Sequence, residues 1–165
     1  LACRQSLHRA KNEGSAVPAI TLDAREVPSE PAAWETVQLP LAPALLTCAI
    51  TNLVDNALRY HRGPTSVSAT LQWHAGTAGD GQVEICVRDQ GPGLTADECG
   101  HALKRFWRKS GSDPGSGLGL TIVHRIAESA GGTLVLEPGT PGLVARLRLS
   151  TCAADAAPAH GIAPG

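Results

Sequence analysis

The sequence predicts an α/β fold of two layers, in which a mixed and mostly antiparallel sheet carries its helices on one face. Segments that alternate apolar and polar residues indicate strands, and segments with apolar residues every three or four positions indicate helices. Strands and helices do not alternate one for one, which argues against a doubly wound parallel sheet. The 165 residues, 42% hydrophobic but only 3% aromatic, suffice for one domain with an aliphatic core.

The first half of the chain is expected to hold two short strands, one long helix and a longer strand. The short strands fall at 19–22 and 34–37, with a Pro- and Glu-rich loop between them. From Leu45, apolar side chains recur on one face of a helix that the Gly-Pro pair at 63–64 ends. Residues 67–73 then alternate apolar and polar, as in a half-buried strand.

The second half begins with another alternating run at 83–87, which is expected to pair antiparallel with the strand at 67–73. From 89 to 119 the chain is irregular apart from a short helical stretch near 96–103, and a loop this long is typical of a functional segment. The remaining expected elements are an amphipathic helix at 118–130 and strands at 133–137 and 143–149.

Composition divides the chain into three parts. Residues 1–18 resemble the remnant of a preceding element, 19–150 form the domain, and 151–165, rich in Ala, Pro and Gly, are expected to be a disordered tail. The chain opens on Leu1 and contains no Met, so we interpret it as a piece of a longer protein. A net charge of −1 gives no argument for nucleic acid or for a membrane surface, and no apolar run reaches the length of a membrane helix.

A polar stripe interrupts the first long helix. Asn52 and Asn56 are one turn apart, and Arg59 and Tyr60 follow one turn later on the same side. Mg²⁺ takes oxygen ligands and keeps waters and phosphate oxygens in its shell, so the amide oxygen of Asn56 suits it. Taken alone, a solvated helix face explains this pattern more often than a metal site does.

A carboxylate follows the apolar strand at 83–87. Asp89 at the strand end can accept a hydrogen bond from the amino group of a flat base, and Gly91 and Gly93 let the backbone close over that base. A plain Asp-x-Gly-Pro-Gly turn explains the motif equally well when it stands alone.

A glycine-rich segment opens the second long helix. Gly115, Gly117 and Gly119, with Leu118 and Leu120, would expose backbone N–H groups that suit phosphate at a helix start. No Gly-Lys-Ser/Thr follows, so the segment is not a P-loop.

The stretch before this loop is basic and aromatic. Four cations flank Phe106 and Trp107, and one or more of them could reach a terminal phosphate. A solvated basic loop with an apolar anchor is the alternative. The four cations are Lys104, Arg105, Arg108 and Lys109.

The order of these motifs is more specific than any one of them. The segment 52–60 resembles the N box of sensor histidine kinases, 89–93 their G1 box, 105–108 their F box and 115–120 their G2 box. The resemblance covers about residues 34–149. It implies the Bergerat ATP-binding fold, which histidine kinases share with gyrase-type enzymes, mismatch-repair ATPases and a heat-shock chaperone.

The resemblance also implies roles. Asn56 would ligate Mg²⁺, Asp89 would bind the adenine amino group, and the glycines of 115–120 would hinge a lid over 94–116. Asn52, Arg59 and Arg108 would be the catalytic residues, with Arg108 directed at the γ-phosphate. The implied ATP-binding residues are Asn56, Arg59, Tyr60, Asp89, Gly91, Gly93, Arg108, Gly115, Gly117, Leu118, Gly119 and Leu120.

One position separates branches of this superfamily. Asn52 stands where the hydrolysing branches carry a Glu that activates water, and an amide is a poor base. This favours phosphoryl transfer to a protein over ATP hydrolysis. A Bergerat-fold ATPase and a serine kinase of the anti-sigma-factor type remain as alternatives.

None of the six His lies in the motif of a phosphoacceptor histidine. The acceptor is therefore expected on a separate dimerisation domain, with the receiver domain of a response regulator downstream. The chain would then be the cytoplasmic catalytic domain of a two-component sensor in the inner membrane, with no membrane contact of its own.

Two residues depart from the family pattern. His61 follows Tyr60 where small hydroxyl residues are usual. Val144 stands where we expect a hydroxyl residue on the adenine side, so a water-mediated contact to adenine is in doubt.

Overall fold

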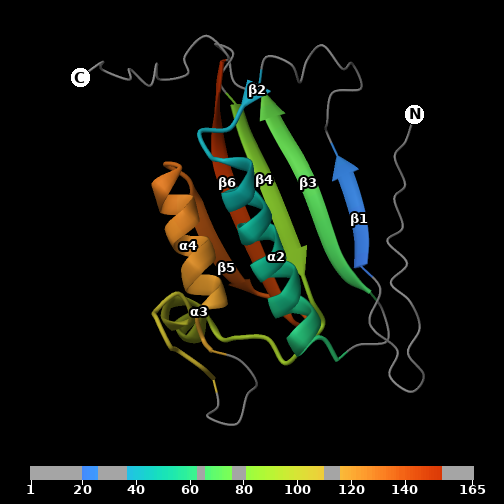
Figure 1. Cartoon of the computed structure of the whole chain (residues 1–165). Coiled ribbons are helices and arrows are strands. Elements are labelled where there is room, and N and C mark those ends of the chain that lie inside the picture. Colours follow the sequence, from blue (N-terminus) through green and yellow to red (C-terminus); the bar gives the residue numbers. More distant parts are fainter. Residues whose placement is uncertain (1–19, 26–36, 63–65, 76–80, 110–115, 154–165) are drawn as a thin grey trace.

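The computed structural model describes residues 20–25, 37–62, 66–75, 81–109 and 116–153. In Figure 1 the helices lie together on one face of a twisted sheet, which confirms the predicted two-layer fold. The helices are α2 (Pro43–Tyr60), α3 (Ala96–Ala102) and α4 (Gly119–Ser129). The strands are β1 (Ile20–Arg25), β2 (Val37–Gln38), β3 (Val67–Ala75), β4 (Gly81–Arg88), β5 (Thr133–Pro138) and β6 (Leu143–Ala153).

The sheet is mixed because one strand pair is parallel. Its order is β1-β3-β4-β6-β2, with β5 also paired to β6. β1 runs parallel to β3, and the other pairs, including the predicted pair of β3 and β4, are antiparallel. The sheet therefore has the mixed, mostly antiparallel character expected from the sequence.

The C-terminal strand is longer than predicted. β6 continues to Ala153, so the expectation of a disordered tail from 151 was wrong for its first three residues. Pairing extends the strand, because Thr151 lies opposite Gly81 of β4 and Cys152 lies opposite Gln38 of β2. The rest of the expected tail, 154–165, lies outside the described residues, as do 1–19 and Trp34.

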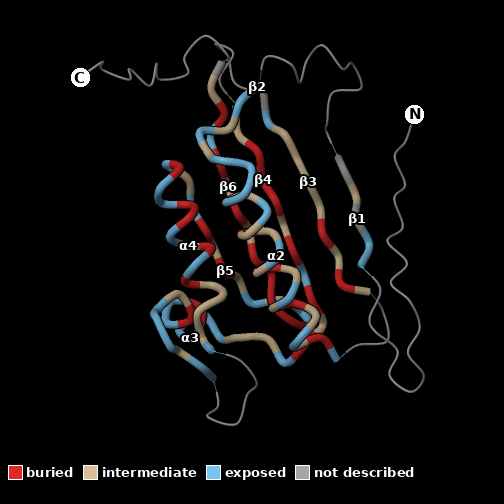
Figure 2. The backbone as a smooth tube through the Cα atoms, viewed as in Figure 1, coloured by how far each residue is buried: buried red, intermediate tan, exposed pale blue. Residues whose placement is uncertain are grey.

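The core lies between the helices and the sheet, and Figure 2 shows buried positions along α2, α4, β4 and β6. The alternation in β4 and β6 accounts for this, since every second side chain points toward the helices. Leu53 and Val123 contribute from the helices, and Leu147 and Leu149 from β6. The core is aliphatic, as the composition predicted.

Local signals set the helix ends. α2 begins at Pro43, two residues before the predicted apolar run, and proline is favoured in the first helical turn. α3 begins with a capping box, in which the Thr95 hydroxyl accepts from the Glu98 N–H and the Glu98 carboxylate accepts from the Thr95 N–H. Within the described residues, none of the helices has the length and apolar character needed to cross a membrane.

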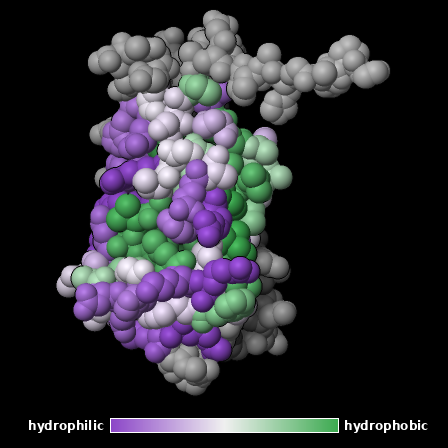
Figure 3. Space-filling model, turned by 90° about the vertical axis from the view of Figure 1, so that its left-hand side faces the viewer, coloured by the Kyte–Doolittle hydropathy of each residue, from purple (hydrophilic) through white to green (hydrophobic). Residues whose placement is uncertain are grey.

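The side of the molecule formed by α4 and β5 is chemically mixed. Figure 3 shows apolar patches beside a hydrophilic strip at mid-height and a hydrophilic band below them. Ile122 of α4 is one of the exposed large apolar residues, with 39% of its surface accessible.

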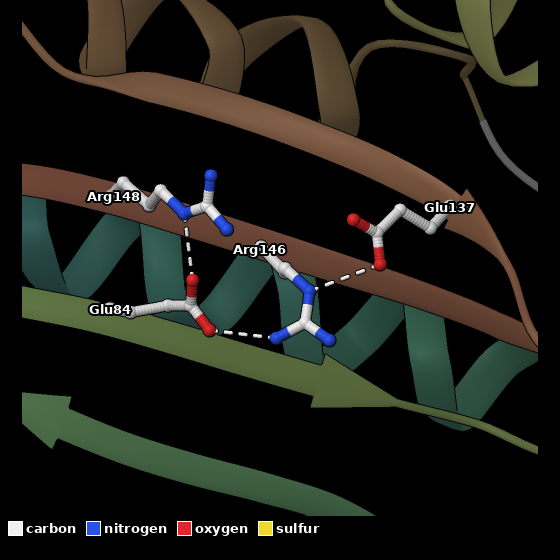
Figure 4. A network of polar contacts seen from close by, with 4 residues as sticks. All are labelled: Glu84, Glu137, Arg146 and Arg148. Atoms are coloured by element: carbon white, nitrogen blue, oxygen red, sulfur yellow. Dashed lines mark hydrogen bonds and ion pairs between the residues drawn. The ribbon is translucent and has the colours of Figure 1, made fainter.

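The face of the sheet that the helices leave uncovered carries an ion-pair network around one buried carboxylate, drawn in Figure 4. Glu84 of β4 is only 5% exposed and accepts hydrogen bonds from Arg146 and Arg148 of β6, both at 2.7 Å. Arg146 also donates to Glu137 of β5 at 3.1 Å. Burial alone would raise the pKa of Glu84, but the two arginines outweigh it and hold that pKa below its usual value.

Candidate functional site

A cavity of about 410 Å³ lies at one end of the molecule, where α2, the end of β4, the loop after it and the start of α4 meet. Its volume falls in the range of small-molecule sites. Its lining combines amides, charges and apolar groups: Asn52, Asp55, Asn56, Arg59, Tyr60, Arg62, Asp89, Pro92, Gly93, Leu94, Ala102, Trp107, Arg108, Lys109, Ser116, Gly117, Gly119, Leu120 and Leu143.

The polar stripe of α2 forms one wall of this cavity. Asn52, Asn56, Arg59 and Tyr60 all line it, so their helical spacing does bring them together on one side. The amide nitrogen of Asn52 donates to the Cys48 carbonyl at 2.8 Å. This bond orients the side chain and leaves its Oδ1 beside the start of α4.

The start of α4 approaches that amide closely. A Cβ added at Gly119 would lie 3.2 Å from Oδ1 of Asn52, a tight contact that glycine avoids. The glycine therefore leaves space for the amide oxygen where the cavity meets the start of α4.

Asp89 forms the deep end of the cavity and is only 3% exposed. The described backbone bonds to its side chain both end on Oδ1, from the N–H of Gly91 at 2.7 Å and of Leu143 at 3.3 Å. Oδ2 is thus left for a donor from a ligand. Burial raises the pKa of Asp89, and the two N–H groups offset this only in part.

Around Asp89, three glycines approach neighbouring backbone so closely that a side chain would not fit at their positions. A Cβ at Gly91 would lie 2.4 Å from the Tyr60 carbonyl oxygen, and one at Gly142 would lie 2.0 Å from the Asp89 carbonyl oxygen. Gly93 has a φ of 65° and would meet the Gly142 carbonyl. Glycine is required at these positions, and of the three only Gly93 lines the cavity itself.

The far wall comes from the segment between α3 and α4. Arg108 and Gly117 line the cavity, and the Phe106 N–H donates to the Gly117 carbonyl at 3.2 Å, which joins the two ends of this segment. Phe106 has a φ of 62°, an unusual conformation for an aromatic residue, and its ring is 66% exposed. The Arg105 guanidinium lies 5.6 Å from the centre of that ring.

Lys109 lines the cavity, and hydrogen bonds from its ammonium group fix its position. Its ammonium group donates to the Glu98 carboxylate at 3.0 Å and to the Gly93 carbonyl at 3.2 Å. The contact ties the basic stretch to the capping box of α3.

Most of the sequence-predicted site residues meet at this cavity. Gly91 lies behind the lining and holds Asp89, Leu118 caps α4 without lining the cavity, and Gly115 lies outside the described residues. The remaining predicted residues line it: Asn52, Asn56, Arg59, Tyr60, Asp89, Gly93, Arg108, Gly117, Gly119 and Leu120.

The assignment of Val144 to the adenine side was wrong. Val144 faces the uncovered side of the sheet, in a shallow groove with Cys86 and Arg146, and Leu143 lines the cavity instead. The alternation of Val144, Arg146 and Arg148 with apolar residues already indicated this orientation. The position on the cavity side is therefore apolar.

Other lining residues had little or no signal in the sequence. Asp55 is an ordinary exposed residue of α2, and Arg62 is an exposed residue just after that helix. Gly142 does not line the cavity but packs against Asp89 from a turn far from the motifs. Among the described residues there is no group of three His, Cys, Asp or Glu suited to a metal ion. A hard cation here would depend on the Asn56 amide oxygen together with oxygens of the ligand, a donor set that fits Mg²⁺.

The family model for histidine kinase-, DNA gyrase B- and HSP90-like ATPases matches residues 42–151. The chain is 36% identical over 109 residues to signal transduction histidine-protein kinase AfsQ2 of Streptomyces coelicolor, covering 64% of this chain and 19% of that protein. It is 42% identical over 93 residues to sensor protein QseC of Salmonella typhi, covering 56% of this chain and 19% of that protein. The chain thus spans about a fifth of the length of these relatives.

A solved structure shares this architecture. The mycobacterial sensor histidine kinase MprB superposes with a TM-score of 0.61 at 27% identity, over 81% of this chain and 83% of that one.

Proposed function

Because the chain belongs to the family of histidine kinase-, DNA gyrase B- and HSP90-like ATPases, we propose that it binds Mg–ATP in the cavity and donates the γ-phosphoryl group to a histidine on a separate domain. The observation that carries this proposal is the meeting of an amide stripe, a buried carboxylate and a glycine-opened helix around one cavity. In this proposal the carboxylate suits the base, the amide stripe suits the metal, and the start of the glycine-opened helix suits the phosphates.

The adenine end of the proposed site is Asp89. Its unused Oδ2 accepts the adenine amino group, while Gly91 and Gly93 leave the flat base room against the backbone. The buried carboxylate favours a ligand that donates a hydrogen bond, because such a bond compensates for lost hydration. Leu143 supplies an apolar contact beside it.

The phosphate end lies between α2 and α4. Asn56 ligates Mg²⁺, and Arg59, Tyr60 and Arg108 contact the phosphates, with N–H groups at the start of α4 nearby. When bound, the metal neutralises charge on the phosphate oxygens. Arg108 binds the γ-phosphate in this proposal, and Gly117 and Gly119 act as hinge residues before and at the start of α4.

Asn52 argues for transfer rather than hydrolysis. Its amide nitrogen is engaged by the Cys48 carbonyl. The oxygen that remains is not a base at neutral pH, so water is poorly activated. Phosphoryl transfer needs positioning and charge stabilisation more than a base from this domain.

The proposed partners follow from this chemistry. The acceptor histidine lies on the dimerisation domain of the same sensor kinase, and the receiver domain of a response regulator takes the phosphoryl group next. This catalytic domain works on the cytoplasmic side of an inner-membrane sensor, in keeping with relatives named as sensor proteins.

The test combines this chain, labelled Mg–ATP and the dimerisation domain of the full protein. The expected product is an acid-labile phosphoprotein, formed by the wild type and lost in Asn56→Ala, whose metal ligand is gone. Gln72→Ala is the matched control, since it removes an amide from the uncovered face of the sheet.

Other products would point elsewhere. An acid-stable product would identify a serine kinase, and rapid release of inorganic phosphate without an acceptor would identify an ATPase. Labelling by Asn56→Ala at the wild-type rate would contradict the site assignment.

A further inference from the structure

A histidine joins the end of α2 to the loop that carries Asp89. His61 caps α2, with its N–H bonded to the Ala57 carbonyl at 2.9 Å, and is only 7% exposed. Its ring nitrogen Nδ1 accepts a hydrogen bond from the Gln90 N–H at 3.3 Å. An Nδ1 that accepts from an N–H carries no proton of its own, so this contact requires the unprotonated nitrogen.

Gln90 lies between the two residues that define the deep end of the cavity. On one side of it is Asp89, and on the other is Gly91, whose N–H holds Oδ1 of Asp89 at 2.7 Å. The loop has little freedom elsewhere, because Gly91 lies against the Tyr60 carbonyl with no room for a Cβ. The His61 bond is therefore one of the contacts that fix the direction of the Asp89 carboxylate.

The charged residues described near the His61 ring come from the end of β4 and from the residue that follows His61. Asp89 comes from the end of β4 and interacts electrostatically with His61. Arg62 follows directly and donates to the carbonyls of Arg59 and His61, so its guanidinium is turned to the backbone. The turn between β5 and β6, at 139–142, contains no ionisable side chain.

A proton added to Nδ1 would change this corner in two ways. The new N–H would face the Gln90 N–H, so the acceptor would be lost and two donors would oppose each other. The ring would also become a cation beside Asp89 and would compete with any ligand for that carboxylate. Both changes act on the loop that binds the base.

We propose that His61 is a positioning residue whose neutral ring holds Gln90, and through it Asp89, in the orientation that binds the nucleotide base. Taking up one proton from solvent at Nδ1 releases Gln90, so acidification lowers nucleotide affinity through His61. The inference rests on the proposed function, because it assigns a role toward the same nucleotide.

The test compares Mg–ADP binding by wild type, His61→Asn and His61→Ala, measured by calorimetry between about pH 8 and about pH 5.5, the range in which imidazoles titrate. Asn places an oxygen near the position of Nδ1 and does not titrate. Wild type should lose about fivefold more affinity on acidification than His61→Asn, as expected for one lost hydrogen bond. His61→Ala should bind more weakly at the upper pH and lose no more than His61→Asn.

Protonation of the nucleotide phosphates affects all three proteins alike, so the ratio of wild type to His61→Asn isolates the ring. A second readout is the NMR shift of the Gln90 N–H without nucleotide, which should titrate in wild type and stay constant in His61→Asn. A merely structural histidine would leave the affinity ratio of wild type to His61→Asn constant with pH.

A constant affinity ratio across the pH range, or a Gln90 N–H that titrates equally in both proteins, would overturn this inference and leave the proposed function standing. Wild type that binds no Mg–ADP even at about pH 8 would overturn both. If His61→Ala fails to fold, the pair of wild type and His61→Asn still decides the question.

Discussion

Strand β4 and the residue after it carry two buried carboxylates that face opposite sides of the sheet. Glu84, 5% exposed, lies on the uncovered face between two arginines, whereas Asp89, 3% exposed, lies at the cavity and is held by backbone N–H groups. Their pKa values move apart: the arginines bring that of Glu84 down despite its burial, and burial drives that of Asp89 up.

The difference separates a charge that is compensated within the fold from one for which we propose a ligand. Glu84 is compensated by cations within the fold, so it needs nothing from outside. Asp89 is buried, only partly compensated and open to a cavity, and a carboxylate in that state gains from binding a donor. The pairing of each buried charge, rather than its burial, is why we propose Asp89 and not Glu84 as the carboxylate that binds a ligand.

The largest expected effect breaks the comparison at Asp89. Asp89→Asn should weaken Mg–ATP binding by up to about 100-fold, because a charge-assisted hydrogen bond to the base is lost. Folding should not suffer, since the amide oxygen still accepts from Gly91 and Leu143. Titration calorimetry and urea unfolding measure the two quantities, and an unfolding loss equal to the binding loss would contradict a functional role.

The second effect breaks the comparison at Glu84. Glu84→Gln should lower the free energy of unfolding by about 2 kcal/mol and leave ATP affinity unchanged. The loss stays below that of a fully buried pair because the side chains of Arg146 and Arg148 are 30% and 39% exposed and can be hydrated. Glu137→Gln is the matched control.

Glu137 pairs with the same Arg146, but its side chain is 45% exposed. Glu137→Gln should therefore lower the free energy of unfolding by less than about 0.5 kcal/mol. Equal losses from the two glutamate variants in urea unfolding would show that burial of Glu84 adds nothing.

The smallest expected effect is a difference in how the two carboxylates make folding stability depend on pH. The pKa of Glu84 is depressed in the folded state, so its stabilisation is present above its usual value of 4.5 and is lost as pH falls through the folded pKa. The pKa of Asp89 is raised, so its ionisation costs stability as pH rises above its usual 3.8 and through the folded pKa.

We therefore expect the free energies of unfolding of Glu84→Gln and Asp89→Asn to differ from that of wild type with opposite signs at neutral pH. Both differences should shrink as the pH is lowered. The free energy of unfolding of Glu84→Gln should approach that of wild type from below, and that of nucleotide-free Asp89→Asn from above. Differences that stay constant with pH would show that neither carboxylate couples to folding through its charge.

Much of the fold was predictable because the periodicities are strong. β3, β4, α2 and α4 begin within about two residues of the predicted points, since one buried face imposes the pattern. The end of β6 was not predictable, because pairing with Gly81 and Gln38 makes Thr151 and Cys152 a strand in spite of a tail-like composition.

The site was predictable where one element supplies several groups, as with Asn52 and Asn56 on α2. It was not predictable where distant backbone segments meet. Gly142 lies against Asp89 through a turn more than fifty residues away, and nothing near it in sequence marks that contact. The alternation of β6 could be read from Arg146 and Arg148, which place Val144 on the uncovered face of the sheet. The position on the adenine side was nevertheless assigned to Val144 instead of Leu143.

The network around Glu84 also bears on how the chain finds its fold. A one-residue slip of β4 between β3 and β6 would turn Glu84 and Arg88 into the aliphatic layer and expose Val83, Ile85 and Val87. Each misplaced charge would lose both water and partner. The charged residues on the polar face of the sheet thus make shifted strand pairings unfavourable during folding. Asp89 therefore reaches the cavity only when the strands pair in the correct register.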